Sequence, residues 1–290
     1  MANLKEIRTR INSVSSTRQI TSAMKMVSAA KLRKAQNAIT HMRPYAEKLT
    51  EILQHLCSSV HDLESNPFAQ NRKPERILLV VISSNRGLCG AFNSNIIKQT
   101  NFLIQEKYSN QYKHGNVGIL TIGKRGYENL LKKGYKILEE HNHIYDDLQY
   151  NNVLSISEKL MHLFEEKFYD RIELIYNSFK NVAVQDLRVE PFLPIEFESE
   201  VGIHSDYIFE PDKGLILENL IPRTLTLQLY KAILDSSTSE HGARMTAMHK
   251  ATDNATDLIK ELTLTYNKAR QASITKEILE IVGGAEAQKG

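Results

Sequence analysis

The sequence predicts an α/β fold in which a long antiparallel coiled coil of the N- and C-terminal helices carries an inserted Rossmann-like α/β domain. Both ends of the chain have apolar residues at steps of three and four over long, glycine-poor stretches. The middle alternates short apolar runs with stretches of helical spacing. We therefore expect three parts: an N-terminal coiled-coil helix in 1–66, an α/β domain in 76–210 and a C-terminal coiled-coil helix in 215–290.

The N-terminal part has no glycine, and its only proline is Pro44. This composition predicts one helix from Leu4 to about Cys57, with a bend near the proline. Its coiled-coil seam is expected to break once, at a stutter in the heptad pattern. The predicted seam residues are Leu4, Ile7, Ile11 and Val14, and, after the offset, Ile20, Met24 and Val27.

The middle part begins after a polar, proline-containing stretch, "ESNPFAQNRKP" (64–74), which reads as a linker. Apolar or alternating runs predict strands at 77–83, 117–122, 171–176 and 182–189. Helical spacing appears between them at 91–108, 124–134 and 155–168. This order is typical of a mainly parallel sheet covered by helices.

The C-terminal helix is predicted from about Leu225 to Val282, and Gly242 is the only glycine before its last turn. That glycine costs about 1 kcal/mol relative to alanine in a helix and suggests a local bend. Two seams at opposite ends of the chain predict an antiparallel pair, with the α/β domain inserted between them. The expected C-terminal seam residues are Met248, Ala251, Ala255, Leu258, Leu262, Tyr266 and Ala269.

Basic residues are concentrated at the N-terminus. The whole chain carries a net charge of +3. Residues 1–48 hold ten Lys or Arg against two Glu, a net charge of +8, so the other 242 residues carry −5. On a helical wheel these cations surround the helix, whereas a helix on a membrane or in a DNA groove gathers them on one face. The charge pattern favours a rod enclosed by acidic protein partners over nucleic-acid binding.

The turn "ISSNRGLCGAFN" (82–93) is the best enzyme candidate, because it joins an apolar strand to a helix. Its glycines, Gly87 and Gly90, form only G-x-x-G, without the third glycine of a dinucleotide site or the G-K-[ST] ending of a P-loop. Cys57 and His61 share a helix face but are too few for zinc. The two cysteines also form no disulfide framework. We therefore expect no catalytic residue, no metal and no cofactor.

Several ordered motifs resemble one family, the gamma subunit of F-type ATP synthases. They cover essentially the whole chain: "IRTRINSVSSTRQITSAMKMVSAAKLRKAQ" with "RPYAE", "SSNRGLCGAFN", "DYIFEPD" (206–212), and "ARMTAMHKATDNATDLIKELTLTYNKARQASITKEILEIVGGA". Two alternatives remain open on the residues alone. One is a nucleotide-binding α/β protein with dimerising helical arms, and the other is a basic nucleic-acid-binding coiled coil.

The resemblance implies a central rotor shaft that couples proton flow through a membrane ring of c subunits to conformational change at catalytic beta subunits. It implies a non-catalytic subunit, with the alpha and beta subunits, the epsilon subunit and the c ring as partners. The N-terminus shows no transit peptide or signal peptide. The expected location is therefore the cytoplasmic face of a bacterial inner membrane, as a peripheral protein.

The resemblance also implies contact residues. Met24, Arg86, Cys89, Arg270 and Gln271 are expected to contact beta subunits, with Arg86 and Cys89 on an exposed loop. Tyr207 and Glu210 are expected at the foot near the c ring. A C-terminal tip that is apolar around much of its circumference is expected to turn in an apolar bearing. Its residues are Ile274, Ile278, Leu279, Ile281 and Val282.

Overall fold

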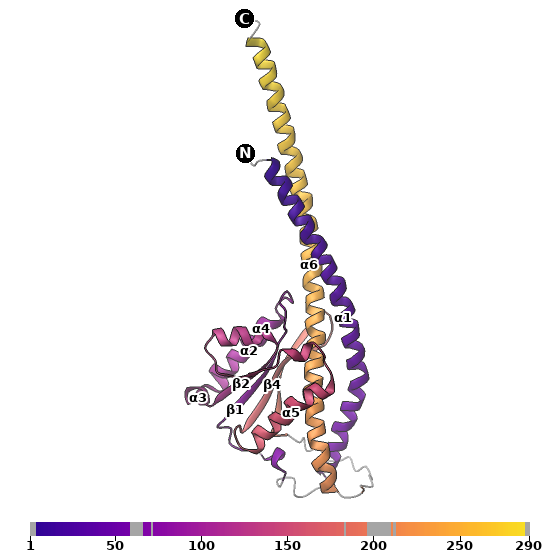
Figure 1. The fold of residues 1–290 in the computed structure, drawn as a ribbon, viewed down its shortest axis with the longest axis vertical. Coiled ribbons are helices and arrows are strands. Elements are labelled where there is room, and N and C mark those ends of the chain that lie inside the picture. Colours follow the sequence, from indigo (N-terminus) through magenta and orange to yellow (C-terminus); the bar gives the residue numbers. More distant parts are fainter. Residues whose placement is uncertain are drawn as a thin grey trace. The chain divides into compact units, whose positions relative to one another are not determined.

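The computed structural model describes residues 4–58, 66–70, 72–182, 184–195, 210 and 213–287 (Figure 1). By its internal contacts the chain falls into two compact units, Met1–Ser28 with Met245–Gly290, and Ala29–Arg244. The domain boundaries predicted from the sequence, at residues 66, 76, 210 and 215, stay predictions. The elements, in order, are α1 (Leu4–Ser58), η2 (Pro67–Ala69), β1 (Ile77–Ile82), α2 (Phe92–Phe102), η3 (Leu103–Lys107), α3 (Ser109–Lys113), β2 (Val117–Ile122), α4 (Lys124–Lys132), β3 (Ile137–Glu140), η4 (His143–Tyr145), α5 (Tyr150–Glu165), β4 (Arg171–Phe179), β5 (Gln185–Leu193) and α6 (Lys213–Ala287).

The α/β unit is built on a five-stranded sheet in the order β3-β2-β1-β4-β5. β1 pairs in parallel with β2 and with β4, and β2 pairs in parallel with β3. β5 returns antiparallel to β4. The predicted mainly parallel sheet is confirmed, with one antiparallel strand at its edge.

The sequence analysis missed β3 and misplaced the hairpin. β3 reads "ILEE", which is too short and too charged to predict a strand, and it depends on pairing with β2. β4 runs on to Phe179, and β5 occupies 185–193 in place of the predicted 182–189. The turn that separates them is held by Asn181, whose side chain accepts a hydrogen bond from the Val184 backbone (2.8 Å).

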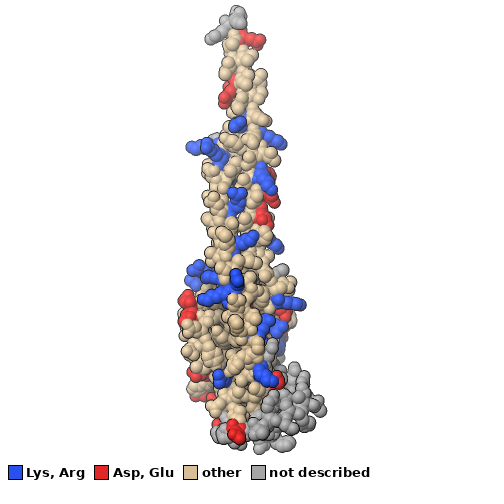
Figure 2. All heavy atoms as spheres, turned by 90° about the vertical axis from the view of Figure 1, so that its right-hand side faces the viewer, with Lys and Arg blue, Asp and Glu red and all other residues tan. Residues whose placement is uncertain are grey.

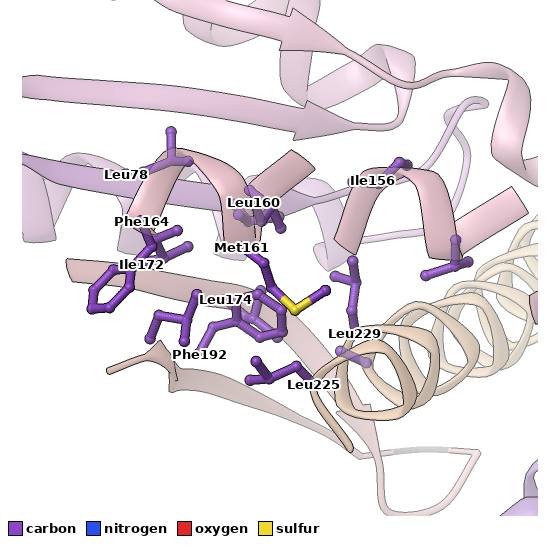
Figure 3. Close-up of a cluster of buried hydrophobic side chains, with 14 of the residues drawn as sticks. Leu78, Ile156, Leu160, Met161, Phe164, Ile172, Leu174, Phe192, Leu225 and Leu229 are labelled. Atoms are coloured by element: carbon purple, nitrogen blue, oxygen red, sulfur yellow. The ribbon is translucent and has the colours of Figure 1, made fainter. Parts of the chain in front are cut away.

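Helices cover both faces of this sheet, as expected for parallel strands that are apolar along their whole length. All six residues of β1 are buried, and alternate ones belong to different clusters. Leu78 and Val80 pack with α5 and α6, as the close-up of this cluster shows for Leu78, Leu160 and Leu225 (Figure 3). Leu79 and Val81 pack on the opposite face with α2 and α4. The described residues therefore form one sheet with a core on each side.

α6 begins 12 residues before the predicted start near Leu225. Pro222 lies in these added turns, and proline lacks an N–H and usually ends or kinks a helix. In the structure the helix continues through this proline. Leu217 is 6% exposed and Ile221 is fully buried in the core, so tertiary packing stabilises the turns that precede Pro222.

The two helices pair antiparallel within each unit. In the unit that holds both ends of the chain, Thr252 donates a hydrogen bond to Thr21 (2.9 Å), and Lys25 lies 3.5 Å from His249. In the other unit, Arg43 of α1 lies 3.5 Å from Asp235 of α6. The residue numbers rise along one helix as they fall along the other, which confirms the predicted antiparallel coiled coil.

The predicted stutter is wrong. Ile20 and Val27 are 61% and 57% exposed, while Thr21 and Ser28 are buried at 8% and 3%. The heptad therefore continues from Ile7 through Val14 to Thr21 and Ser28 without an offset. Small polar side chains occupy the seam because they let the helices approach closely, and the hydroxyls find partners. Ser28, for example, donates to the carbonyl of Met24 (2.8 Å).

The predicted seam position of one residue in the C-terminal helix is also wrong. Leu258 is 38% exposed, and its neighbour Ile259 is half-buried in its place. α6 continues through Gly242 as one helix from Lys213 to Ala287, and the local bend suggested there stays a prediction. Among the described residues no helix is long and apolar enough to span a membrane.

Candidate functional site

The turn after β1 lies where open α/β sheets bind their ligands. β1 connects through α2 to β2 on one side, and the chain later returns to β4 on its other side. The carboxyl ends of β1 and β4 are therefore the topological switch point, the usual place of a nucleotide crevice. The question is whether the residues from Ser83 to Asn93 form such a crevice.

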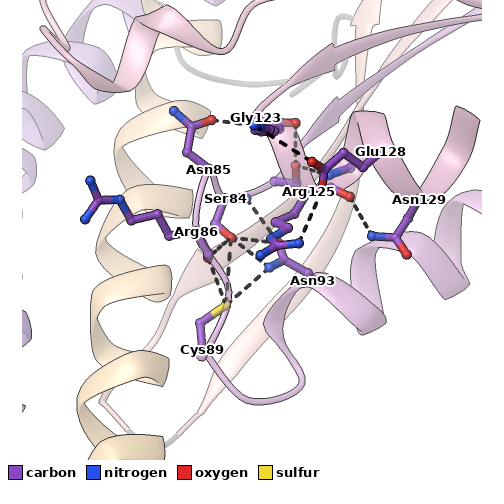
Figure 4. Close-up of polar contacts among 12 residues, drawn as sticks. Ser84, Asn85, Arg86, Cys89, Asn93, Gly123, Arg125, Glu128 and Asn129 are labelled. Carbon is purple, nitrogen blue, oxygen red and sulfur yellow. Dashed lines mark hydrogen bonds and ion pairs between the residues drawn. The ribbon is translucent and has the colours of Figure 1, made fainter. Parts of the chain in front are cut away.

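Hydrogen bonds inside the turn fix its shape (Figure 4). The backbone N–H of Ser84 donates to Asn93 Oδ1 (3.1 Å), and Ser84 Oγ donates to the carbonyl of Arg86 (2.7 Å). Asn93 Nδ2 donates to Ser84 Oγ (2.7 Å) and to Cys89 Sγ (3.3 Å). A phosphate cradle aims its N–H groups at the ligand, whereas Ser84 here donates to a side chain of the same turn.

The loop is tied to α6 by Arg244, which is 8% exposed. Its guanidinium donates to the carbonyls of Arg86 (2.9 Å) and Gly87 (3.2 and 3.3 Å). The same side chain pairs with Glu240 one turn earlier (Nη1–Oε1 2.7 Å). These carbonyl oxygens would repel a phosphate. The turn instead binds the guanidinium of Arg244.

α6 also fills the crevice itself. A Cβ added at Gly242 would lie 3.6 Å from the Phe179 ring and 3.7 Å from the Val182 backbone, just beyond the end of β4. Ala243 belongs to the core cluster that contains Val81 and Phe92. The place where a doubly wound protein holds a nucleotide is therefore occupied by the protein's own helix.

Burial shapes the electrostatics of this contact. It raises the pKa of Glu240, an effect opposed mainly by Arg244 and also by Lys31 and Arg86. It lowers the pKa of His241 to about 4, and the cations of Arg244 and Lys31 add to that shift. At neutral pH the imidazole of His241 is therefore uncharged, beside the contact between Arg244 and Glu240.

The predicted contact residues of the loop divide into exposed and buried ones. Arg86 is exposed, as expected. Cys89 is not: it is 2% exposed, because its sulfur points inward to Ser84 and Asn93. Burial raises the pKa of the Cys89 thiol. The exposed apolar side chain is Leu88, which is 64% exposed and held at φ +62°, a conformation that leucine rarely adopts.

Metal-ligating side chains do not gather into a site in the described part of the chain. No group of three His, Cys, Asp or Glu is arranged to hold a metal ion among those residues. The "HNH" stretch at 141–143 is partly packed: His141 Nε2 lies 3.2 Å from Glu139, and its ring meets that of His143 edge-on. The side chain of Cys57 and the whole of His61 lie outside the described residues.

The paired helices carry apolar side chains on their outer surface as well as at the seam. Ile20, Met26 and Val27 are 57–65% exposed, and Met24 is half-buried. The face drawn in Figure 2 shows Lys and Arg side chains interspersed with uncharged surface along α1. Apolar groups between cations are typical of a surface that contacts protein partners.

Among the residues that the structure describes, the C-terminal end of α6 has no partner helix. Every residue from 274 to 287 is exposed, because α6 continues past the first turn of α1 (Figure 1). The five predicted tip residues, Ile274, Ile278, Leu279, Ile281 and Val282, are 45–71% exposed. A helix this apolar is normally buried, so the tip presents apolar surface that this chain leaves uncovered.

The remaining predicted residues are surface residues or lie outside the described part. Arg270 and Gln271 are exposed on α6, and Glu210 is exposed. Tyr207 lies outside the described residues. Sequence reasoning missed Arg244, Glu240 and Leu88. The spacing of Glu240 and Arg244 at i, i+4 could have indicated a pair, but nothing in the sequence shows that the pair is buried against a loop more than 150 residues earlier.

Known proteins are similar to this sequence along the whole length of the chain. The profile of a family described as ATP synthase matches residues 3–288. The ATP synthase gamma chain of Christiangramia forsetii is 58% identical over 291 residues and covers 100% of both chains. That of Flavobacterium johnsoniae is 58% identical over 292 residues, again with 100% of both chains covered.

Solved structures share the fold. A chain from the OSCP/F1/c-ring part of the Euglena gracilis mitochondrial ATP synthase has a TM-score of 0.69 at 21% identity, covering 98% of this chain and 94% of that one. A chain from the rotor of the same enzyme in rotational state 1 has a TM-score of 0.66 at 20% identity, covering 93% and 98%. One from the Tetrahymena thermophila central stalk and c ring has a TM-score of 0.59 at 24% identity, covering 80% and 99%.

Proposed function

The chain belongs to the family of ATP synthase gamma chains, and from that premise we propose that it works as the central rotor shaft of an F-type ATP synthase. The observation that carries the proposal is the antiparallel helix pair of the unit Met1–Ser28 with Met245–Gly290. Its outer surface and tip expose apolar side chains. Exposed apolar side chains along a helix pair indicate a surface that other subunits cover, as around a shaft.

The proposed partners follow from this role. The alpha and beta subunits form a ring around the helix pair, the epsilon subunit binds the rotor, and the c ring turns it as protons cross the membrane. The chain is then a peripheral protein that reaches the membrane only through its partners. Its relatives at 58% identity come from bacteria, which supports a place on the cytoplasmic face of the inner membrane.

Catalysis is proposed to lie on the beta subunits and not on this chain. The support is the crevice at the carboxyl ends of β1 and β4. Arg244 donates to two carbonyls there, and Gly242 packs against Phe179. A nucleotide at this place would have to displace the α6 helix. The alternative of a nucleotide-binding protein with dimerising arms is therefore disfavoured.

We propose contacts with the beta subunits at two places, the loop after β1 and the helix pair. Arg86 and Leu88 present a cation and an apolar side chain from the loop after β1. The buried Cys89 supports the loop from inside and is proposed to lie close to this contact without forming its surface. Met24, Arg270 and Gln271 are proposed to contact beta along the helix pair.

The two ends of the rotor complete the arrangement. Tyr207 and Glu210 are proposed as foot residues near the c ring. The exposed tip, Ile274 to Val282, is proposed to turn inside an apolar sleeve of the ring, where burial of its side chains holds the axis while offering no directional bond. Rotation then costs little at the tip, since apolar contact is not directional.

The proposed beta contact of Arg270 and Gln271 can be tested in the assembled complex. Replacing both by alanine removes one partner of charged hydrogen bonds, which typically costs roughly 2–5 kcal/mol at an interface. We expect at least a tenfold loss of proton-driven ATP synthesis, with the chain itself still folded because both side chains are exposed.

A matched double variant, Lys132→Ala with Lys133→Ala, changes two exposed residues at the end of α4 and should leave synthesis unchanged. Gel filtration of the purified complexes separates loss of assembly from loss of coupling. Wild-type assembly and synthesis in the Arg270→Ala, Gln271→Ala complex would exclude a torque-bearing contact at these residues.

A further inference from the structure

A pocket of about 320 Å³ opens at the amino ends of β1, β2 and β3, within the unit Ala29–Arg244. These three strands are parallel, so the pocket lies at the opposite end of the sheet from the loop after β1. Its volume is at the lower end of the range of small-molecule sites, roughly 300–1,000 Å³, which combine apolar walls with a few placed polar groups. The proposed rotor function gives this pocket no role.

The end of α5 carries two aromatic side chains over this end of the sheet. Lys167 has φ +60°, and the backbone N–H groups of Lys167 and Phe168 donate to the carbonyls of Phe164 (3.1 Å) and Leu163 (3.0 Å). This is the Schellman arrangement, which ends a helix and fixes the residues that follow it. Phe168 lines the pocket and remains 54% exposed. Tyr169 packs against the core cluster beneath α5.

Gly118 of β2 makes room for the hydroxyl of Tyr169. A Cβ added at this glycine would lie 2.4 Å from that oxygen, so the hydroxyl occupies the place of a side chain on the strand. Burial raises the pKa of Tyr169, and the hydroxyl therefore stays a proton donor at neutral pH. A buried tyrosine hydroxyl usually has a hydrogen-bond partner. The described part of the chain supplies none here, so the donor is open to an acceptor in the pocket.

The sheet register places a cation beside this hydroxyl. Ile137 of β3 pairs with Ile119 of β2. Lys136, one residue before Ile137, therefore lies beside Gly118, at the spacing of neighbouring strands, about 4.8 Å. Lys136 and Tyr169 both line the pocket. Within the part of the chain that the structure describes, the Lys136 ammonium makes no hydrogen bond or ion pair.

The pocket lining carries one unpaired positive charge. It contains two cations, Arg76 and Lys136, and no carboxylate among the described residues. Arg76 is paired with Asp170, whose carboxylate lies 3.8 Å from the guanidinium Nε and accepts from the Arg76 backbone N–H (2.8 Å). The carboxylates of β3, Glu139 and Glu140, lie at the other end of that strand. Lys136 is therefore the cation that an anion in the pocket would meet.

We propose that the pocket binds a small monocarboxylate with an apolar body. Its carboxylate accepts hydrogen bonds from the Tyr169 hydroxyl and the Lys136 ammonium, and its body lies against Leu138, Leu163 and Phe168. A monoanion matches the single unpaired cation, and a carboxylate can accept from two donors at once. Binding also removes exposed apolar surface of Phe168 from water, which is favourable. This site stands or falls independently of the rotor function.

An NMR titration of the full chain with phenylacetate, observed at labelled leucine methyl groups, tests the proposal. Acetate and 2-phenylethanol serve as matched probes, because each carries one half of the proposed chemistry. We expect saturable shifts of the Leu138 and Leu163 signals, with an affinity at least tenfold tighter than for either matched probe. Leu131, exposed on α4 and outside the pocket, should not shift. Equal affinity for phenylacetate and either matched probe, or no saturable shift at Leu138 and Leu163, would overturn the assignment.

Tyr169→Phe keeps the ring and removes only the hydroxyl. It should weaken phenylacetate binding about tenfold, since a hydrogen bond to a charged group is lost. The matched control, Tyr127→Phe, makes the same change on α4 outside the pocket lining and should leave binding unchanged. Wild-type affinity in Tyr169→Phe would show that the hydroxyl does not meet the ligand.

Lys136→Gln removes the unpaired cation. It should weaken phenylacetate binding threefold or more and leave the weaker binding of 2-phenylethanol unchanged, because the alcohol carries no charge. The matched control, Lys133→Gln, removes the same charge three residues earlier, outside the pocket lining. Equal weakening in the two lysine variants would reduce the effect to general electrostatic attraction and exclude the proposed contact.

Discussion

At the scale of single residues, the cluster of Arg244, Glu240 and His241 decides what the loop after β1 can do. Arg244 donates hydrogen bonds to loop carbonyls at the place where a nucleotide site would bind its ligand. Glu240 pairs with this buried guanidinium. Breaking such a pair by removing one partner costs about 3–5 kcal/mol, because the other charge stays buried. The cluster therefore fixes the loop that presents Arg86 and Leu88.

The histidine of this cluster predicts a pH dependence of stability. Its pKa is lowered from 6.5 to about 4 in the folded chain by burial, Arg244 and Lys31. Between these two values the unfolded chain binds the proton and the folded chain does not, so stability falls as pH drops from 6.5 toward 4. The slope from one such group is at most about 1.4 kcal/mol per pH unit.

His241→Gln removes that titration and keeps a hydrogen-bonding side chain beside Arg244. We expect the difference in unfolding free energy between the variant and the wild type to grow in favour of the variant as pH falls through this window. Comparing the two proteins cancels the contributions of Glu240 and other carboxyls. A difference that stays constant from pH 7 to pH 4, measured by urea unfolding at each pH, would contradict the depressed pKa.

At the scale of elements, the heptad of α1 decides which apolar residues support the helix pair and which remain for partners. Ile7 is 5% exposed at the seam, whereas Ile20 is 61% exposed on the outer surface. The seam instead uses Thr21, which is held by Thr252. Residues of similar chemistry thus have opposite roles according to their heptad position.

Truncation of these two isoleucines should separate the roles. Ile7→Ala should lower the stability of the unit Met1–Ser28 with Met245–Gly290 by about 2 kcal/mol or more, as expected for a buried isoleucine. Ile20→Ala should change it by less than about 0.5 kcal/mol. Native-state hydrogen exchange of the full chain measures both, and equal losses would contradict the uninterrupted heptad.

α6 gives a second prediction at this scale. A Cβ at Gly242 would meet its nearest neighbours at 3.6–3.7 Å, which is ordinary van der Waals contact. The position is helical, so Gly242→Ala should raise the unfolding free energy by about 1 kcal/mol through helix propensity. Gly123→Ala is the contrasting control, because φ is +108° there and a Cβ would lie 2.1 Å from the Ser83 carbonyl oxygen.

Thermal unfolding compares the two glycine variants directly. Gly242→Ala should melt above the wild type and Gly123→Ala below it. A lower melting temperature for Gly242→Ala would mean that α6 and the β4–β5 hairpin approach more closely than these contacts indicate.

At the scale of the whole molecule, rotation is the prediction that matters most, and Leu88 makes it testable. This side chain is 64% exposed, whereas the natural thiol next to it is 2% exposed. Leu88→Cys with Cys89→Ser therefore places a thiol where a beta subunit can reach it. A cysteine in the facing loop of beta can form a disulfide when the Cα atoms come within about 4.4–6.8 Å.

Oxidation should stop ATP hydrolysis over many turns, and reduction should restore it. If one beta subunit is isotopically marked before reduction, turnover should let the thiol form its next bond with unmarked neighbours. Wild-type Cys89 with the same beta cysteine is the control and should crosslink poorly. Full turnover with the bond intact, or crosslinking only to the original beta, would contradict rotation.

The sequence pattern of neighbouring residues determines much of the secondary structure of this protein. The glycine-free composition and the apolar steps from Leu4 to Val14 predicted α1 almost to its last residue, and the run "ILLVVI" predicted β1. Side-chain periodicity is a property of neighbouring residues, so it can be read without the fold. The lack of a third glycine in the loop likewise argued against a nucleotide before any geometry was known.

Tertiary structure decided the features that depend on distant residues. Cys89 is buried in the core cluster that also contains Ile175 and Ala243, and Thr21 lies at the seam because Thr252 meets it from the other end of the chain. β3 forms only as a neighbour of β2, and α6 continues through Pro222 because Ile221 is buried in the core. The free energy of each of these comes from contacts across long sequence separations, which no local pattern contains.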